Sequence, residues 1–263
     1  MKMAKLVRAE TSEGIAIVTI DNPPMNVLSK QVVAELDEVF TRLEEDRDVL
    51  VVILTGAGNE AFMAGADIKE LPFWLEMDKD SIKKTTKDIH RVLNGIYDLS
   101  KPTIAVLNGI TFGGGCELAL TCDIRIAEEK VKLGLPEVKL GLLPGAGGTQ
   151  RLPRLIGEAK AKELMFTGDP LTAEGAYKIG LVNKVTANGE GVRVALEMAK
   201  KMAGYSSQAL SRIKQAANNG VNTSLEFGLE METELFSEIF ATEDAKEGIQ
   251  SFINKRPPNF KHC

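Results

Sequence analysis

The sequence predicts an α/β fold, in which strands buried on both faces alternate with amphipathic helices. Residues 49–54 form an unbroken apolar run, which is the pattern of a strand covered on both sides. Similar short runs follow at 103–107 and 124–127, with helically spaced apolar residues between them. Because neighbouring parallel strands need a crossover connection, this alternation indicates repeated βαβ units.

Local patterns place the elements in order along the first part of the chain. Residues 15–20 predict a strand that ends in a turn cluster at 21–24. Ser29 suits the N-cap of a helix whose apolar residues, from Val32 to Leu43, recur at helical spacing. Further on we expect a helix at 81–99, a helix from Cys116 and a strand at 131–135, in addition to the strands at 49–54, 103–107 and 124–127.

From Glu158 the pattern becomes mostly helical. Glycines at 145–148 predict a wide loop, Thr172 suits a helix N-cap, and 181–185 predicts a short strand. Because the alternation ends near residue 190, we divide the chain into an α/β core of residues 1–190 and a helical region of residues 191–263. Within that region, helices are expected at 193–203, 206–218, 223–241 and 243–254.

The segment 223–241 is apolar around more than one stripe, from Leu225 and Phe227 to Ile239 and Phe240. Such a broad apolar girth indicates burial against two bodies. A second subunit is one candidate for the additional body. The alternative is a helix buried within its own chain, and the residues do not separate the two interpretations.

Composition and charge exclude several classes of protein. The chain has 263 residues and 44% of them are apolar, which suits a sizeable core and excludes overall disorder. A formal net charge of −5 without any basic block disfavours a nucleic-acid binder. No apolar run approaches the roughly 18 residues of a membrane span. The N-terminus lacks a signal-peptide pattern, and Glu10 and Glu13 disfavour a transit peptide, so we expect a cytoplasmic protein or a mature organelle-matrix protein.

Cysteine and histidine content narrows the chemistry. The three cysteines, Cys116, Cys122 and Cys263, are odd in number and form no C-x-x-C motif, so we expect neither disulfides nor a thiolate zinc site. We therefore expect a reducing compartment. We interpret Cys116 and Cys122 as small core residues. The histidines are His90 and His262, and the motifs of serine hydrolases and zinc proteases are absent. We interpret His90 as a partly exposed filler, which leaves acid–base chemistry to carboxylates.

Two glycine-rich segments look like nucleotide-binding loops but lack the required context. Residues 56–61 match the loose G-x-G-x-x-A pattern, yet Gly65 interrupts the helix that should carry a pyrophosphate. Residues 145–149 lack the lysine of a phosphate-binding P-loop. We interpret the first segment as a turn and reject the second as a phosphate site.

A third glycine run, at 113–115, is more informative. It lies between a buried strand and a helix, where backbone N–H groups favour developing negative charge. On these residues alone, the slightly favoured interpretation is a sharp connector followed by a glutamate, Glu117, at the start of a helix. However, the loop at 64–69 can present another N–H, and Glu137 adds a second acid. Together these groups suit the stabilisation of an oxyanion combined with proton transfer.

Four motifs resemble the crotonase (enoyl-CoA hydratase) family. They are FMAGADIKE at 62–70, NGITFGGGCEL at 108–118, LPEV at 135–138 and LLPGAGGTQRL at 142–152, and the likeness extends from about residue 5 to 260. The resemblance implies a spiral of ββα and βαβ turns and a helical C-terminal region that trimerises, commonly as a dimer of trimers. It also implies a place in fatty-acid β-oxidation and no metal or redox cofactor, since coenzyme A is part of the substrate.

The resemblance further implies roles for individual residues. Ala66 and Gly114 match the N–H donors of the family's oxyanion hole, and Glu117 and Glu137 match the catalytic glutamates of its hydratases. Gly145 matches a position near the reacting water. The residues that match coenzyme A-binding positions are Met25, Val27, Ala64, Ala66, Asp67, Ile68, Lys69, Gly114, Gly145, Phe252 and Lys255.

The implied activity is that of a hydro-lyase that adds water reversibly to a 2-enoyl-CoA, with Glu117 as the base and Glu137 as the acid. An isomerase of the same fold, which needs one acid–base carboxylate, is an alternative. A second alternative is an RNA-binding relative, although the acidic balance and the pair of glutamates argue against it. The expected partners are therefore an acyl-CoA thioester and further copies of the chain, without nucleic acid or membrane. We expect Arg151 and Arg154 to close structural ion pairs.

Overall fold

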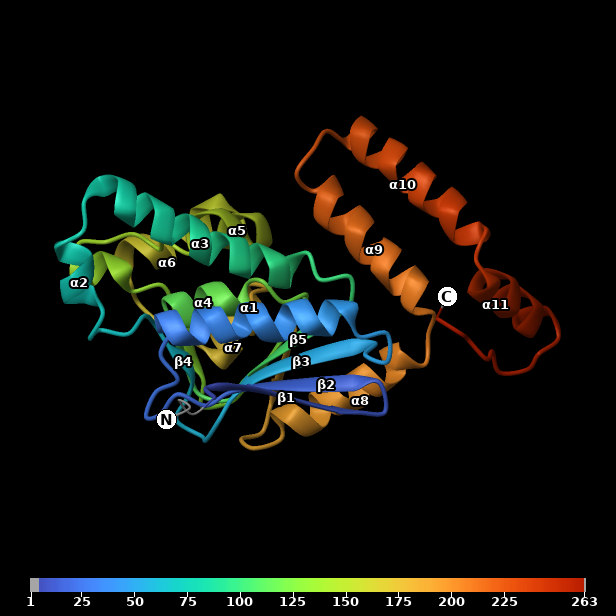
Figure 1. The fold of residues 1–263 in the computed structure, drawn as a ribbon, viewed down its shortest axis with the longest axis horizontal. Helices are drawn as coiled ribbons and strands as arrows, with labels where there is room; N and C mark the ends of the chain where they lie inside the picture. The colour runs from blue at the N-terminus through green and yellow to red at the C-terminus, as the bar shows by residue number, and fades with distance from the viewer. Residues whose placement is uncertain (1–4, 263) are drawn as a thin grey trace.

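Two β-sheets carry the fold of residues 5–262, the part of the chain that the computed structural model describes (Figure 1). The larger sheet has the strand order β1-β2-β3-β5-β7-β10 and is parallel except at the β1–β2 pair. The smaller sheet has the order β4-β6-β8-β9 and is parallel except at β9. The strands are β1 (Val7–Ser12), β2 (Ile15–Ile20), β3 (Val51–Gly56), β4 (Ala61–Ala64), β5 (Thr103–Leu107), β6 (Ile110–Phe112), β7 (Ile124–Glu128), β8 (Lys132–Gly134), β9 (Leu171–Thr172) and β10 (Lys184–Thr186).

Helices cover both faces of this framework, which confirms the predicted α/β class. They are α1 (Lys30–Glu45), α2 (Leu71–Leu75), α3 (Lys79–Tyr97), α4 (Gly114–Ala119), α5 (Gly148–Ile156), α6 (Glu158–Thr167), α7 (Ala173–Lys178), α8 (Gly191–Ala203), α9 (Ser207–Gly220), α10 (Leu225–Phe240) and α11 (Glu243–Ile253), with a 3₁₀ turn, η1 (Glu137–Leu140). Across residues 5–262, none of them combines the length and apolar character that crossing a bilayer requires.

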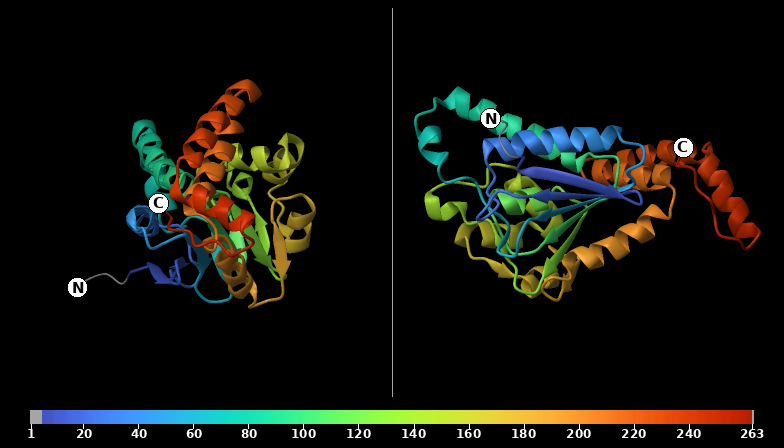
Figure 2. Two further views of the ribbon diagram at one scale, coloured as in Figure 1. Left: turned by 90° about the vertical axis from the view of Figure 1, so that its right-hand side faces the viewer. Right: turned by 60° about the horizontal axis from the view of Figure 1, so that its bottom comes forward.

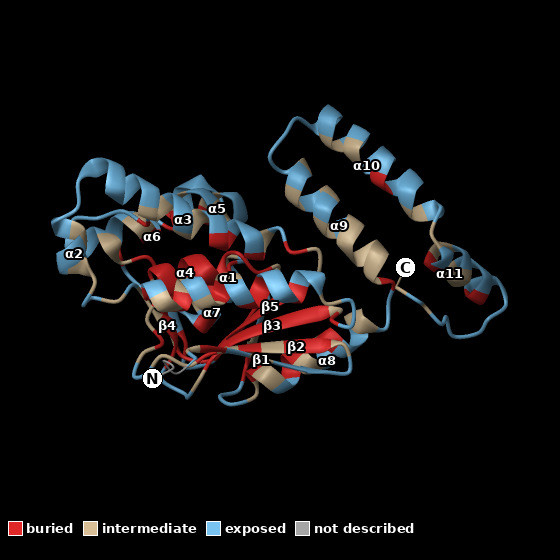
Figure 3. Cartoon of the chain, in the orientation of Figure 1, coloured by how far each residue is buried: buried red, intermediate tan, exposed pale blue. Residues whose placement is uncertain are grey.

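The central strands β3 and β5 of the larger sheet are buried on both faces, as their apolar runs predict. Every residue of β3 is buried. Because side chains alternate along a strand, Val52 and Leu54 face the core beneath α1, α3 and α4, whereas Val51 and Ile53 face α8. Figure 3 shows these strands and the inward faces of the covering helices as buried. The sheet is therefore a rigid support, held by apolar packing on two sides.

The helix starts that the sequence predicts are confirmed by their caps. The Ser29 hydroxyl accepts a hydrogen bond from the Val32 N–H at the start of α1, and the Thr172 hydroxyl accepts one from the Gly175 N–H at α7. Several shorter elements were not expected from the sequence, namely β1, β4, β6, β9, α2 and α5. In particular, α5 begins at Gly148, inside the segment predicted as a loop. Strands β4, β6 and β9 and helix α2 have two to five residues each, which carry too little periodicity to distinguish them from turns.

The last helices leave the sheets as an arm. Helix α8 still packs on the larger sheet through Val194, Ala195 and Ala199, so the predicted boundary at residue 190 falls one helix before the chain leaves the core. Helices α9, α10 and α11 then extend away from both sheets (Figures 1 and 2). Lys214 fastens α9 to the core, because its Nζ lies 2.9 Å from Oδ2 of Asp123.

The broad apolar surface of α10 is left open within this chain. Leu235 is the buried residue of α10, whereas Leu225 is 78% exposed and Phe236 is 63% exposed. Figure 3 shows most of the arm as exposed. The interpretation that this helix is buried within its own chain is therefore wrong.

Candidate active site

Three parallel strands of the smaller sheet end side by side, and each leads into a predicted site residue. The last residues of β4, β6 and β8 pair with one another across the sheet. Ala66 follows β4, Gly114 and Glu117 follow β6, and Glu137 follows β8. Ligands of parallel sheets characteristically bind at the carboxyl ends of the strands. The sheet register thus gathers segments that lie far apart in the sequence.

A tight turn at Gly113 leads from β6 into α4. Its φ of 51° favours glycine, and a Cβ at this position would lie 3.0 Å from Oε1 of Glu137. At Gly115 a Cβ would lie only 2.1 Å from the Met63 carbonyl oxygen, so the start of α4 packs directly on the backbone of β4. The glycine run is therefore a sharp connector, and it also brings the start of α4 against both neighbouring segments of the site.

The N–H groups of Ala66 and Gly114 are placed to bind one acceptor. A Cβ on Gly114 would lie 3.9 Å from the Ala66 nitrogen. Within residues 5–262, neither N–H donates to another group of the chain, and Gly114, as the first residue of α4, has no acceptor inside its helix. Two unoccupied N–H donors beside each other at a helix start can stabilise an oxyanion.

Glu117 lies in the first turn of α4 and is buried. Its Oε1 accepts hydrogen bonds from the N–H groups of Ala146, at 2.7 Å, and Gly148, at 2.8 Å. Burial raises the pKa of Glu117, while the two amides and the positive charge of Arg151 act in the opposite direction. The remaining oxygen, Oε2, is left to interact with a substrate or a water.

Glu137 faces the same space from η1. Its Oε2 is buried and has no hydrogen-bond partner in the described part of the chain. Burial raises the pKa of Glu137 to about 7, and the nearby Glu117 carboxylate contributes to the rise. Near neutral pH a large fraction of Glu137 therefore carries a proton that it can donate, as a general acid must.

The predicted coenzyme A-binding loops lie against one another beside these groups. The Ala64 N–H donates to the Met25 carbonyl, and Leu28 forms a bridge with Ala66. Asp67 turns the following segment, because its Oδ1 accepts the Lys69 N–H at 2.9 Å. The structure thus brings together the residues predicted at 25–27 and 64–69, with Ile68 and Lys69 exposed at the surface.

Two predicted binding residues lie elsewhere in this chain. Phe252 lies in the last turn of α11 with 86% of its surface exposed, and Lys255 follows that helix. Helix α11 lies at the outer end of the arm, far from α4 and β4 (Figures 1 and 2). Within one chain, Phe252 and Lys255 therefore do not contact the site.

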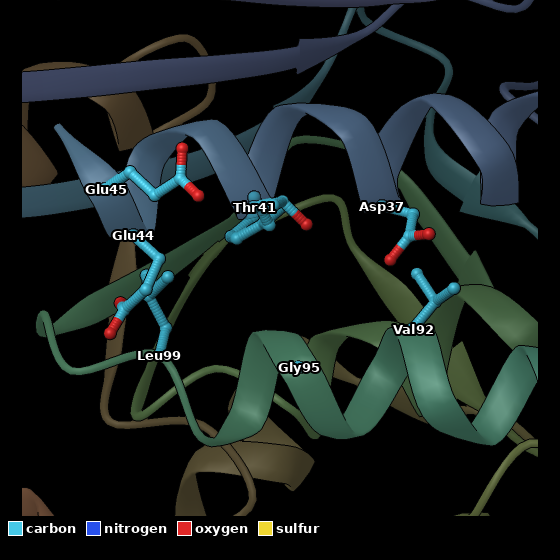
Figure 4. Close-up of a pocket in the computed structure, with 8 residues that line it drawn as sticks. Asp37, Thr41, Glu44, Glu45, Val92, Gly95 and Leu99 are labelled. Carbon is cyan, nitrogen blue, oxygen red and sulfur yellow. The ribbon is translucent and has the colours of Figure 1, made fainter.

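A surface pocket between α1 and α3 is distinct from this site (Figure 4). It has a volume of about 230 Å³ and its lining includes none of the predicted site residues. Two of its carboxylates already have partners, since Asp37 pairs with Arg91 and Glu44 accepts hydrogen bonds from Ser100. The pocket carries no arrangement of groups that suggests chemistry.

The loop of residues 144–148 has partners that local sequence patterns do not predict. His90 is not a filler, because its Nε2 lies 2.7 Å from the carbonyl oxygen of Gly145. Arg151 and Arg154 form no ion pair within residues 5–262, so the expectation of structural ion pairs is wrong. Both guanidinium groups bind neutral oxygens instead. Asn94 and Asn222 lie more than 50 residues away along the chain, so local sequence patterns do not reveal these partners.

The cysteines and the segment 56–61 have the structures that we expected from the sequence. Cys116 and Cys122 are buried free thiols, and burial raises the pKa of each to about 12. Cys263 lies outside the described residues. The segment 56–61 connects β3 to β4 without a helix, which confirms the turn. Among the described residues, no cluster of histidine, cysteine or acidic side chains is arranged to hold a metal.

A comparison with known families identifies the family of this chain. A family model described as Enoyl-CoA hydratase/isomerase matches residues 10–262. The chain belongs to the enoyl-CoA hydratase/isomerase family. Within this family, the Short-chain-enoyl-CoA hydratase of Clostridium acetobutylicum is 44% identical over 243 residues, covering 92% of each chain. The Crotonyl-CoA hydratase of Syntrophomonas wolfei is 39% identical over 252 residues, covering 95% of this chain and 96% of that one.

Solved structures of family members share the whole architecture. The crystal structure of an enoyl-CoA hydratase from Bacillus anthracis superposes with a TM-score of 0.93 at 38% identity, covering 98% of this chain and 100% of that one. The expected crotonase fold is therefore confirmed. Members of this enzyme family act on acyl-CoA thioesters, which fits loops that flank a pair of N–H donors.

Proposed function

We propose that the protein is an enoyl-CoA hydratase, a hydro-lyase that adds water reversibly to the double bond of a 2-enoyl-CoA. The observation that carries the proposal is that two N–H donors without a partner in the described residues lie near two carboxyl groups in different environments. Glu117 is held by two amides, whereas Glu137 has a pKa of about 7 and an unpartnered oxygen. Relatives named as hydratases of short-chain enoyl-CoA and crotonyl-CoA support the same activity.

In the proposed reaction the thioester carbonyl oxygen binds between the N–H groups of Ala66 and Gly114. Glu117 takes a proton from water, and the water oxygen forms a bond to C3 of the substrate. The electrons of the double bond move toward the thioester oxygen, where the two N–H groups stabilise the developing charge. One such donor is typically worth about 10²–10³ in rate.

Glu137 completes the reaction by donating its proton to C2, so that water is added across the double bond. Glu137 then carries the negative charge and Glu117 the proton, and transfer of one proton restores the starting state. The protonation states belong to the pair, since each carboxyl influences the other. The reaction needs only water and groups of the chain, so we propose no cofactor besides the coenzyme A of the substrate.

We also propose that coenzyme A lies along the loops at 25–27 and 64–69. Gly145, whose carbonyl is bound by His90, would lie at the water side of the site. Phe252 and Lys255 could join the nucleotide end only from another copy of the chain, because α11 is remote in its own. In this view coenzyme A is bound partly across a subunit boundary.

Assembly into a trimer or a dimer of trimers is part of the proposal. The exposed apolar side chains of α10 and α11 support it, because a surface of this kind in water usually marks an interface. Sedimentation analysis should show a trimer or hexamer. A stable and active monomer at micromolar concentration would contradict the assembly, and removal of residues 223–263 should give unassembled or insoluble protein.

The activity is tested by product analysis of the wild-type protein. With a short 2-enoyl-CoA, the conjugated thioester absorbance should fall as the 3-hydroxyacyl-CoA appears by mass spectrometry. A protein that moves a double bond from the 3 to the 2 position without adding water would be an isomerase. RNA binding in a gel shift at physiological salt, without either activity, would favour the RNA-binding alternative.

We further propose a cytoplasmic location, which the bacterial hydratases among the relatives support. The buried free thiols of Cys116 and Cys122 also suit a reducing compartment.

A further inference from the structure

The carboxylate of Glu117 depends on a loop that other side chains hold in place. Residues Ala146 and Gly148 supply its two amide hydrogen bonds, and the loop turns between them at Gly147, where φ is 109°. The outward carbonyl groups of this loop are also bound. His90 binds the carbonyl of Gly145, and Arg151 Nη1 donates to the carbonyl of Ala146 at 3.2 Å.

Arg151 folds back from the first turns of α5 over this loop. A Cβ at Gly147 would lie 2.1 Å from its Nη1, so the guanidinium packs directly against the turn. Its Nη2 donates to Oδ1 of Asn94 at 2.5 Å, and its Cζ lies 5.7 Å from the centre of the Tyr97 ring. Helix α3 therefore contacts the guanidinium through both Asn94 and Tyr97.

The charge of Arg151 has no carboxylate in contact with it. No ion pair to this residue is present in residues 5–262, and burial lowers its pKa. The carboxylates of Glu117, in α4, and Asp98, at the end of α3, raise the pKa of Arg151, and Glu117 has the larger effect. The effect of the Tyr97 hydroxyl lies between these two. Asp98 is exposed, so solvent weakens its effect. Glu117 is the buried acid among these groups.

The two carboxyl groups of the site differ in what faces them. Burial has the largest influence on Glu117, and the amides of Gly148 and Ala146, followed by Arg151 from α5, oppose it. Glu137, on η1, is influenced first by its burial, then by its own backbone N–H and by Glu117, and no cation is among these groups. The buried thiol of Cys116, next to Glu117, is neutral. Because a cation acts on Glu117 and not on Glu137, the two carboxyl groups differ in how readily they ionise, as the acid and the base of one reaction must.

We propose that Arg151 is a positioning residue for Glu117: it holds the amide-bearing loop on this carboxylate, and its unpaired charge favours the ionised form that accepts a proton. This inference rests on the proposed function, since it gives Glu117 the role of the base. Arg151 does not contact the substrate. It acts through the 146–148 backbone and through the electric field across the loop.

The test compares three variants of the full-length protein. Arg151→Gln removes the charge, Arg151→Lys keeps the charge without the planar fork, and Arg154→Gln is the matched control. Arg154 lies one turn further along α5, where it binds Asn222 and Gln150 rather than the loop. The readouts are kcat, KM and the pH profile of kcat/KM, together with a ¹³C NMR titration of the Glu117 carboxyl group.

In Arg151→Gln we expect the Glu117 titration and the acid limb of kcat/KM to move upward by about one pH unit, because the ionised form has lost a neighbouring cation. The kcat value should fall about 10- to 100-fold with little change in KM. Arg151→Lys should restore the position of the acid limb but not the full kcat. Arg154→Gln should behave as the wild type.

Unchanged titration and unchanged kcat in Arg151→Gln would overturn the inference, as would an equal effect of Arg154→Gln. If Arg151→Gln does not fold, Asn94→Leu serves instead, because Asn94 is exposed and releases only the Nη2 contact. A kcat equal to that of the wild type in Asn94→Leu would then refute the positioning role. The wild-type product assay and the NMR titration are independent, so failure of the hydratase proposal is distinguishable from failure of this inference.

Discussion

Replacement of Glu137 by glutamine should stabilise the folded protein at alkaline pH while it abolishes most of the activity. Burial holds the pKa of this carboxyl at about 7 in the folded state, against an ordinary value of 4.5. Ionised Glu137 is therefore disfavoured by folding. Glutamine has nearly the same shape but no charge, so the variant avoids this cost.

The sign and the pH range follow from the two pKa values. Below pH 4.5 the carboxyl is protonated in both states and costs nothing. As the pH rises from 4.5 to about 7, the unfolded state ionises first and stability is lost, and above about 7 the loss is complete. A shift of this size corresponds to at most about 3 kcal/mol. Because Glu137 is partly exposed, we expect about 1–2 kcal/mol.

The assay is urea unfolding of wild type and Glu137→Gln at pH 5 and pH 8.5, at one protein concentration because assembly contributes to stability. The free energy of unfolding of the variant, relative to wild type, should be higher at pH 8.5 than at pH 5 by about 1–2 kcal/mol. An unpaired amide hydrogen in the variant contributes equally at both pH values, so the difference isolates the charge. Glu129→Gln, at an exposed position outside the site, is the control. A relative stability that is equal at the two pH values would refute the reasoning about Glu137.

The remaining predictions concern catalysis, packing and binding. Glu117→Gln should lower kcat by about 10²–10⁴, since glutamine keeps the amide hydrogen bonds but cannot accept a proton. The double variant with Glu137→Gln should be little less active than the single variants, and near-normal hydration in either single variant contradicts the two-glutamate mechanism. Above pH 7, kcat/KM should fall about tenfold per pH unit as Glu137 loses its proton; a flat profile to pH 9 excludes it as the acid. Gly115→Ala should lower the urea midpoint or prevent folding, because its Cβ would meet the Met63 carbonyl at 2.1 Å; an unchanged midpoint would show that α4 can move. Lys255→Ala should raise KM with little change in kcat, and an equal fall in kcat and kcat/KM would show that the assignment is wrong.

Local patterns in the sequence were sufficient for the framework of this protein. The run at 49–54 predicts the fully buried β3, and the Ser29 and Thr172 caps mark the starts of α1 and α7. These features depend on residues near one another in the chain, since strand burial, helix periodicity and capping are local properties. The glycine run and Glu117 could likewise be identified as a candidate site, and the motifs around them identified the family.

Only the tertiary structure decided how the site works. Ala66, Glu117 and Glu137 come from separate segments, and the parallel register of β4, β6 and β8 places them at one sheet edge. The raised pKa of Glu137 depends on burial by distant residues, and the partners of Arg151 come from α3 and the 146–148 loop. The sequence shows which groups can ionise or donate. Their desolvation and their distances from other charges, which set their energies, arise only when distant segments pack together.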